Sequence, residues 1–147
     1  MLYLDTGILT KWYLPEPDST TAIALRDRFL PPAFLTSLHR VELNNAWQLK
    51  VFRDELSADA IALAWEFFAS DIQAGLWHVP VEPWAEIHSR AASLAEEHSS
   101  KLGTRSMDIL HVAAAEHLDC SHFLTGARRQ ARLAEAIGLP LVLYQPD

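Results

Sequence analysis

The chain has 147 residues, half of them hydrophobic and 21% charged, a composition that suits one globular domain with a core of its own. Its single cysteine, Cys120, excludes an internal disulfide and a cysteine-based zinc site. The net charge of −7 argues mildly against a strongly basic nucleic-acid-binding surface, although a cluster of metal-binding acids would also make the charge more negative.

Short apolar segments alternate with helical patterns along the chain, which indicates the α/β class with a parallel sheet covered by helices. In chain order we predict a strand ending at Asp5, helices over residues 8–13 and 18–30, a strand over 33–36, helices over 37–50 and 57–75, a strand over 77–81, a helix over 82–97, a polar loop over 98–105, a helix over 106–118, a strand over 122–125, a helix over 128–137 and a strand over 141–144. Ser37, Ser57 and Ser106 are the expected N-caps, and Gly138 is the expected C-terminal glycine. No repeat or linker interrupts this pattern, so we expect a single domain over residues 1–147.

Neither a secretion signal nor a membrane segment is expected. Only four residues precede the charged Asp5, which is too few for a signal peptide. The apolar run over residues 60–65 ends at Glu66, far short of a membrane-spanning length. We therefore expect a cytoplasmic protein.

Asp5 directly follows the first predicted strand. In open α/β sheets, ligands bind at the carboxyl ends of strands, so an acid at this position is a candidate for a binding site. The alternative is an ordinary helix N-cap, a role that aspartate often takes.

Glu42 lies in the middle of the predicted helix 37–50. At about 100° per residue, the helical stripe that contains it is expected to include Leu38, Glu42, Asn45 and Leu49, whereas Trp47 is expected to point elsewhere. A carboxylate on an apolar stripe is costly to bury unless something compensates it. The alternative is a partly buried stripe on which Glu42 reaches solvent or pairs with an arginine.

Asp108 lies in the first turn of the predicted helix 106–118, where an acid suits the helix dipole. Its stripe continues through Val112 and Ala115, which are small enough for close packing against a sheet. Asp108 is therefore expected to point inward, and His111, one turn later, is a possible brace for it.

The three acids Asp5, Glu42 and Asp108 together predict a metal site. Three carboxylates within about 5 Å of one another would repel by roughly 3 kcal/mol per pair at an effective dielectric near 20. A divalent cation removes this conflict, and oxygen-only ligands favour Mg²⁺ or Mn²⁺ over zinc. Such ions polarise phosphoryl oxygens and generate hydroxide from water.

Four segments stand out in order along the chain. The first two are LYLDT at residues 2–6 and SLHRVEL at 37–43. The third is SMDILHVAAA at 106–115, and the last combines FLTG at 123–126 with RRQARLA at 128–134 and the Gly-Leu pair at 138–139. Together they resemble the motifs of PIN domains, and the size and organisation of the chain are most similar to the VapC-like ribonuclease toxins of prokaryotic toxin–antitoxin modules.

The resemblance implies a PIN-like three-layer α/β/α sandwich with a short central parallel sheet, and Mg²⁺- or Mn²⁺-dependent cleavage of RNA by Asp5, Glu42 and Asp108. It also implies a homodimer and a small antitoxin partner, for which aromatic residues such as Trp12, Tyr13 and Trp47 are candidate contacts. Thr6 and Thr125 are candidate supporting hydroxyls. The family usually has a further aspartate where this chain has Ala127, which leaves open whether one or two metals bind.

Arg128, Arg129 and Arg132 follow the end of the predicted strand 122–125 and are candidate phosphate contacts, with a solvated basic helix face as the alternative. Two other functions stay open. One is a catalytically weak PIN-fold module that binds RNA or a partner protein, which a metal-dependent nuclease assay would distinguish. The other is a PIN nuclease of RNA processing without an antitoxin, which the absence of a small upstream gene for a DNA-binding protein would favour.

Overall fold

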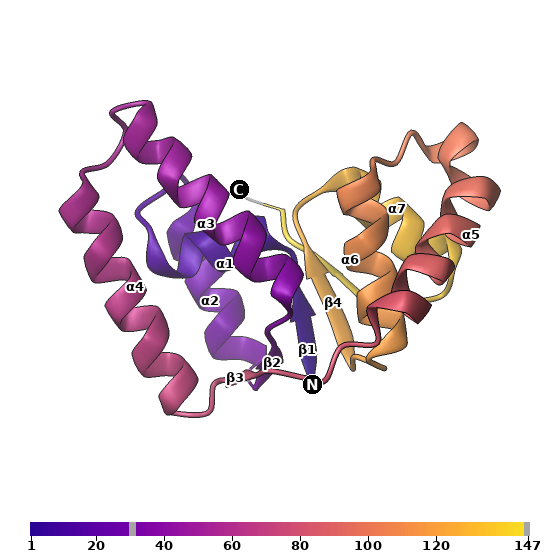
Figure 1. Cartoon of the computed structure of the whole chain (residues 1–147), viewed down its shortest axis with the longest axis horizontal. Coiled ribbons are helices and arrows are strands. Elements are labelled where there is room, and N and C mark those ends of the chain that lie inside the picture. Colours follow the sequence, from indigo (N-terminus) through magenta and orange to yellow (C-terminus); the bar gives the residue numbers. More distant parts are fainter. Residues whose placement is uncertain (30–31, 146–147) are drawn as a thin grey trace. The chain divides into compact units, whose positions relative to one another are not determined.

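Residues 1–29 and 32–145 are described by a computed structural model, in which short strands alternate with helices (Figure 1). The strands are β1 (Leu2–Leu4), β2 (Ala33–Phe34), β3 (Trp77–His78), β4 (His122–Thr125) and β5 (Leu141–Leu143). The helices are α1 (Thr6–Tyr13), α2 (Ser19–Phe29), α3 (Ser37–Phe52), α4 (Ala58–Gln73), α5 (Trp84–Leu102), α6 (Ser106–His117) and α7 (Arg128–Ala136). None of the helices within these ranges is long and apolar enough to cross a membrane.

Contacts divide these elements into two units, each with a core of its own. The first unit comprises residues 1–5 and 81–145, and the second comprises residues 6–80. The expected single domain therefore stays a prediction, and each unit is described by itself.

The first unit is built on parallel strand pairs covered by helices. β1 pairs with β4, with Leu4 opposite Leu124, and β4 pairs with β5, with Thr125 opposite Leu143. α7 packs on β4 and β5, and α6 packs between α5 and α7. The three alanines 113–115 of α6 are fully buried, which allows α6 to approach its neighbours closely. The parallel pairing of β1 with β4 places the carboxyl ends of these two strands side by side.

The second unit pairs β2 with β3 in parallel and packs α1, α3 and α4 around an aromatic core. Trp47 of α3 is fully buried, lies 4.3 Å from Trp65 between ring centroids, and donates a 3.3 Å hydrogen bond to the hydroxyl of Thr10. Tyr13 and Phe68 pack edge to face at 5.1 Å. This core holds α3, which carries Glu42, against α1.

The order and type of the elements agree with the sequence predictions, with differences at several boundaries. α5 extends to Leu102, so residues 98–102 are helical and only 103–105 form the expected loop; Gly103, at a φ of 65°, is the residue that ends the helix. Ser57 is the N-cap of α4 as expected. In α3 and α6 the N-caps are Thr36 and Arg105, and the expected serines, Ser37 and Ser106, are instead the first helical residues. Leu30 of the predicted helix 18–30 lies outside the described residues.

The predicted stripe of α3 is buried at Leu38 but is otherwise wrong in phase. The other buried side chains are spaced by four residues, at His39, Leu43 and Trp47, whereas Asn45 of the predicted stripe is exposed and Glu42 is half-buried. His39 can be buried because its ring Nδ1 accepts the backbone N–H of Thr36 at 3.0 Å. A polar residue thus leads the buried stripe, which disguised it in the sequence. Trp12 is buried as well, so neither tryptophan forms an exposed partner surface.

Candidate active site

Asp5 extends the pairing of β1 with β4 by one residue, because its backbone N–H donates to the carbonyl of Leu124 at 2.8 Å. This register brings Asp5 next to Thr125, the last residue of β4. The Asp5 Oδ2 atom accepts hydrogen bonds from the Thr125 hydroxyl at 2.5 Å and from the Gly126 backbone N–H at 3.1 Å. With only 5% of its surface exposed, Asp5 is a buried carboxylate oriented by the end of the neighbouring strand.

The Thr125 hydroxyl is the centre of a small polar network. It lies 2.8 Å from the side-chain oxygen position of Gln130 and accepts the backbone N–H of Ala127 at 2.9 Å. A hydroxyl has one proton, and the shorter contact to Asp5 is the better place for it, so the Gln130 amide is better oriented with its NH₂ toward Thr125. Gln130 then donates to Thr125, and Thr125 donates to Asp5.

Sequence reasoning missed Gln130. The signal in the sequence is faint: Gln130 shares the buried face of α7 with Leu133 and Ala134, at a spacing of three and four residues. A buried glutamine on an apolar stripe needs hydrogen-bond partners, and only the packing of α7 on β4 identifies Thr125 as that partner.

Asp108 points inward from the first turn of α6, as predicted, and Val112 and Ala115 of the same stripe are fully buried. Its Oδ2 atom accepts the backbone N–H of Arg105 at 3.1 Å and the Nε–H of Arg129 at 3.1 Å. Arg129 therefore forms an ion pair with Asp108 and does not belong to a purely solvated helix face. His111, the possible brace, shares a 3.0 Å hydrogen bond with the Tyr3 hydroxyl.

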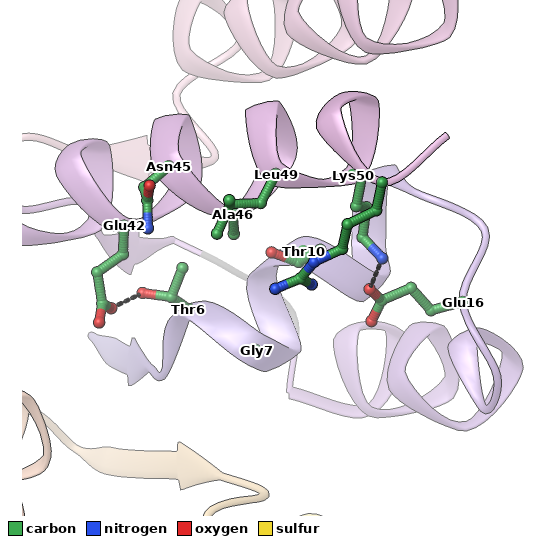
Figure 2. Close-up of a pocket in the computed structure, with 10 residues that line it drawn as sticks. Thr6, Gly7, Thr10, Glu16, Glu42, Asn45, Ala46, Leu49 and Lys50 are labelled. Carbon is green, nitrogen blue, oxygen red and sulfur yellow. Dashed lines mark hydrogen bonds and ion pairs between the residues drawn. The ribbon is translucent and has the colours of Figure 1, made fainter. Parts of the chain in front are cut away.

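Glu42 lies in the second unit, at one end of a pocket of about 390 Å³ between α1 and α3 (Figure 2). The hydroxyl of Thr6, the first residue of α1, donates a hydrogen bond to its Oε2 atom. Figure 2 shows these two side chains directed toward one another, with Asn45 one turn along α3. Thr6 thus orients Glu42 as Thr125 orients Asp5.

The opposite end of this pocket holds an ion-paired cluster. The Glu16 carboxylate lies 2.6 Å from the Lys50 Nζ atom and 3.3 Å from that of Lys11. Burial alone would raise the pKa of Glu16, but the hydrogen bonds and charges of Lys50 and Lys11 outweigh it and lower this pKa. Glu16 in turn raises the pKa of Lys50. Both groups are therefore charged at neutral pH, and Lys50 is already paired.

The three predicted acids are divided between the units: Asp5 and Asp108 belong to the first, and Glu42 belongs to the second. Within the part of the chain that the structure describes, neither unit alone groups three His, Cys, Asp or Glu side chains around a possible metal position. The donors themselves fit Mg²⁺ or Mn²⁺, which prefer oxygen ligands. Both hydrogen bonds that Asp108 accepts from described residues fall on Oδ2, so its Oδ1 atom fits a ligand position.

Comparison with known proteins places this chain in a family. The PIN domain family matches residues 2–136, a range that runs through both units. The chain belongs to the PIN domain family. This membership confirms the predicted fold class, an α/β/α sandwich with a parallel sheet.

Two solved structures have a similar fold. The crystal structure of FitAcB from Neisseria gonorrhoeae gives a TM-score of 0.67 at 20% identity and covers 99% of this chain and 98% of that chain. FitAB bound to an IR36 DNA fragment gives a TM-score of 0.67 at 19% identity, with 97% and 94% covered. No curated protein matches this PIN-domain chain.

Proposed function

We propose that this PIN-domain protein is a metal-dependent endoribonuclease that cleaves RNA phosphodiester bonds. The observation that carries the proposal is the burial of two carboxylates, Asp5 and Asp108, at 5% and 8% exposure within the first unit. Buried carboxylates lower stability unless their charge is compensated, and a divalent cation compensates them while supplying the chemistry of phosphodiester hydrolysis.

In this proposal Asp5, Glu42 and Asp108 hold Mg²⁺ or Mn²⁺, and each carboxylate has a donor that fixes its orientation. Thr125 holds Asp5, Thr6 holds Glu42, and the Arg105 backbone N–H holds Asp108. Such second-layer hydrogen bonds orient metal ligands and tune metal affinity. The bound ion would polarise a phosphoryl oxygen and lower the pKa of an attacking water. Arg128 and Arg132, both exposed on α7, are candidate contacts for RNA phosphates.

We further propose that the protein is the toxin of a toxin–antitoxin pair, acting in the cytoplasm as a homodimer that a small antitoxin inhibits. The resemblance to VapC-like toxins and the likeness to FitAcB and FitAB support this assignment. Exposed apolar side chains of the second unit, rather than the buried tryptophans, are the candidate partner surface. They are Val41 and Phe52 of α3 and Leu63 and Phe67 of α4.

A nuclease assay with the purified protein tests the catalytic proposal. Fluorescent single-stranded RNA and DNA of the same sequence are incubated with Mg²⁺, Mn²⁺ or excess EDTA. Asp5→Asn and Asp108→Asn should each abolish RNA cleavage while the fold persists, and Asp59→Asn, an exposed acid of α4, is the matched control. Full activity in EDTA, or wild-type rates in either site variant, would contradict the metal mechanism.

Co-expression with the product of an adjacent upstream gene tests the partner. A complex that suppresses cleavage is the expected result. Metal-stimulated cleavage by a protein whose expression is harmless, and which is recovered free, would instead favour an RNA-processing nuclease. RNA binding without cleavage under any metal would favour a binding module.

A further inference from the structure

The ion pair between Arg129 and Asp108 connects a cation of this chain to a carboxylate that the proposed function assigns to metal. The Arg129 Nε atom lies 3.1 Å from Asp108 Oδ2, and the two side chains are 43% and 12% exposed. Asp108 is thus enclosed, while its partner reaches solvent.

We propose that Arg129 is the internal counter-ion of Asp108 and that it competes with the divalent cation for this carboxylate. This inference rests on the proposed metal site. In the metal-free protein Arg129 neutralises a buried negative charge, and in the metal-bound protein it moves away.

The position of Arg129 in the fold supports such a role. Arg129 is the second residue of α7, and a positive charge in the first turn of a helix is disfavoured by the helix dipole. Asp108 likewise occupies the first turn of α6, which packs against α7. The attraction of Asp108 therefore has to overcome an unfavourable helix position, and the pair forms only because α6 and α7 place their amino-terminal turns together.

The contact is also easily reversed. It is made by one N–H group and lacks the two parallel hydrogen bonds of the strongest arginine–carboxylate pairs. Because Arg129 is nearly half exposed, its long side chain can turn into water without disturbing the core. A divalent cation on Asp108 would repel the guanidinium, so the binding of one positive group weakens the binding of the other.

One other arrangement makes the opposite prediction. Arg129 could keep Oδ2 while a metal ion uses Oδ1, in which case the arginine would orient Asp108 for the ion. Loss of Arg129 would then weaken metal binding instead of strengthening it. The sign of the change in metal affinity distinguishes competition from support.

The experiment measures Mn²⁺ binding to the full chain by calorimetry in the absence of RNA, for the wild type, Arg129→Gln and Arg128→Gln. Arg128 is the matched control because it is the preceding residue of the same turn and is exposed. We expect Arg129→Gln to bind Mn²⁺ about 1.5- to 5-fold more tightly, the range for losing a partly exposed ion pair, and Arg128→Gln to differ little from the wild type. The melting temperature of Arg129→Gln in EDTA should fall, and saturating Mn²⁺ should close the gap.

A double-mutant test locates the effect. In an Asp108→Asn background, Arg129→Gln should leave Mn²⁺ binding unchanged, because the carboxylate over which the two cations compete is gone. Unchanged or weaker Mn²⁺ binding by Arg129→Gln, or an equal gain from Arg128→Gln, would overturn the competition. If the wild type cleaves RNA with metal and only this gain is missing, the counter-ion proposal alone fails. If neither the wild type nor Arg129→Gln binds Mn²⁺, the metal mechanism fails with it.

Discussion

Replacing Thr125 with valine removes one hydroxyl from the centre of the Asp5 network and changes little else. Valine keeps the branched shape of threonine and suits a strand at least as well. Thr125 is fully buried, and its hydroxyl donates to Asp5, accepts the Ala127 N–H and lies beside Gln130. Thr125→Val therefore removes one hydrogen bond each from Asp5, Gln130 and the Ala127 N–H, while Asp5 keeps the hydrogen bond from the Gly126 N–H.

The magnitude follows from those contacts. A hydrogen bond to a charged group contributes about 1.5–3 kcal/mol and a neutral one about 0.5–1.5 kcal/mol, so we expect Thr125→Val to lower the free energy of unfolding by about 2–4 kcal/mol. In a protein of 147 residues, each 1 kcal/mol shifts the melting temperature by about 2–4 °C. The expected shift is thus roughly 5–15 °C.

Thermal melting in EDTA measures this change, and Thr125→Ser is the matched control. Serine keeps the hydroxyl and loses one buried methyl group, which costs about 1 kcal/mol. Mn²⁺ binding should weaken in Thr125→Val, where Asp5 is no longer held in place, and persist in Thr125→Ser. If valine and serine variants melt at the same temperature and bind Mn²⁺ equally, the hydroxyl does not position Asp5.

Three further predictions concern the removal or addition of a carboxylate. Glu42→Gln should abolish cleavage without lowering apo stability, because the amide oxygen can still accept from Thr6; a clear loss of stability in EDTA would make Glu42 a structural residue. Glu16 has a lowered pKa in the folded protein, so its stabilising contribution is present above the ordinary glutamate pKa of about 4.3 and is lost as the pH falls through its folded value. Melting curves of the wild type and Glu16→Gln should therefore converge in acid, whereas a constant difference would refute the ion-pair argument. Ala127→Asp should shift the metal dependence of RNA cleavage to lower metal concentration. Its stability without metal is the balance of two effects: an aspartate N-cap adds about 1 kcal/mol, and repulsion from nearby acids removes roughly 1–3 kcal/mol. An unchanged metal titration would place position 127 outside the site.

The sequence predicts the fold well where a local pattern carries the information. The strand at residues 122–125 and the helix that ends before Gly138 are as predicted. Both depend on local features: an apolar run forms the strand, and Gly138, at a φ of 73°, follows the end of the helix. The sequence does not predict the extension of α5 because residues 98–101 are all polar, a composition that is typical of loops as well as of helix ends. Gly103 carried the correct signal for the end of that helix.

The site is less predictable, since its contacts join distant residues. Asp5 and Thr125 are 120 positions apart, and Asp108 and Arg129 are 21 apart. Helical periodicity correctly placed Asp108 on an inward stripe, but it cannot show that Arg129 reaches that carboxylate, because the contact depends on how α6 packs against α7. The predicted buried stripe of α3, which contains Glu42, differs from the structure for another reason. The stripe observed there includes a polar residue, His39, which hydrophobic periodicity does not identify as buried.

The segment from Thr125 to Arg129 contacts two carboxylates of the first unit although it contains no acidic residue itself. Gly126 donates its N–H to Asp5, and a Cβ atom there would approach the Tyr144 ring to 3.1 Å, so a larger residue would require this ring to shift. Thr125 supplies a hydroxyl to Asp5, and Arg129 supplies a guanidinium to Asp108. Every one of these groups donates to a carboxylate located elsewhere in the chain. Although residue 127 is alanine, the segment from Thr125 to Arg129 therefore orients Asp5 and neutralises Asp108 without a carboxylate of its own.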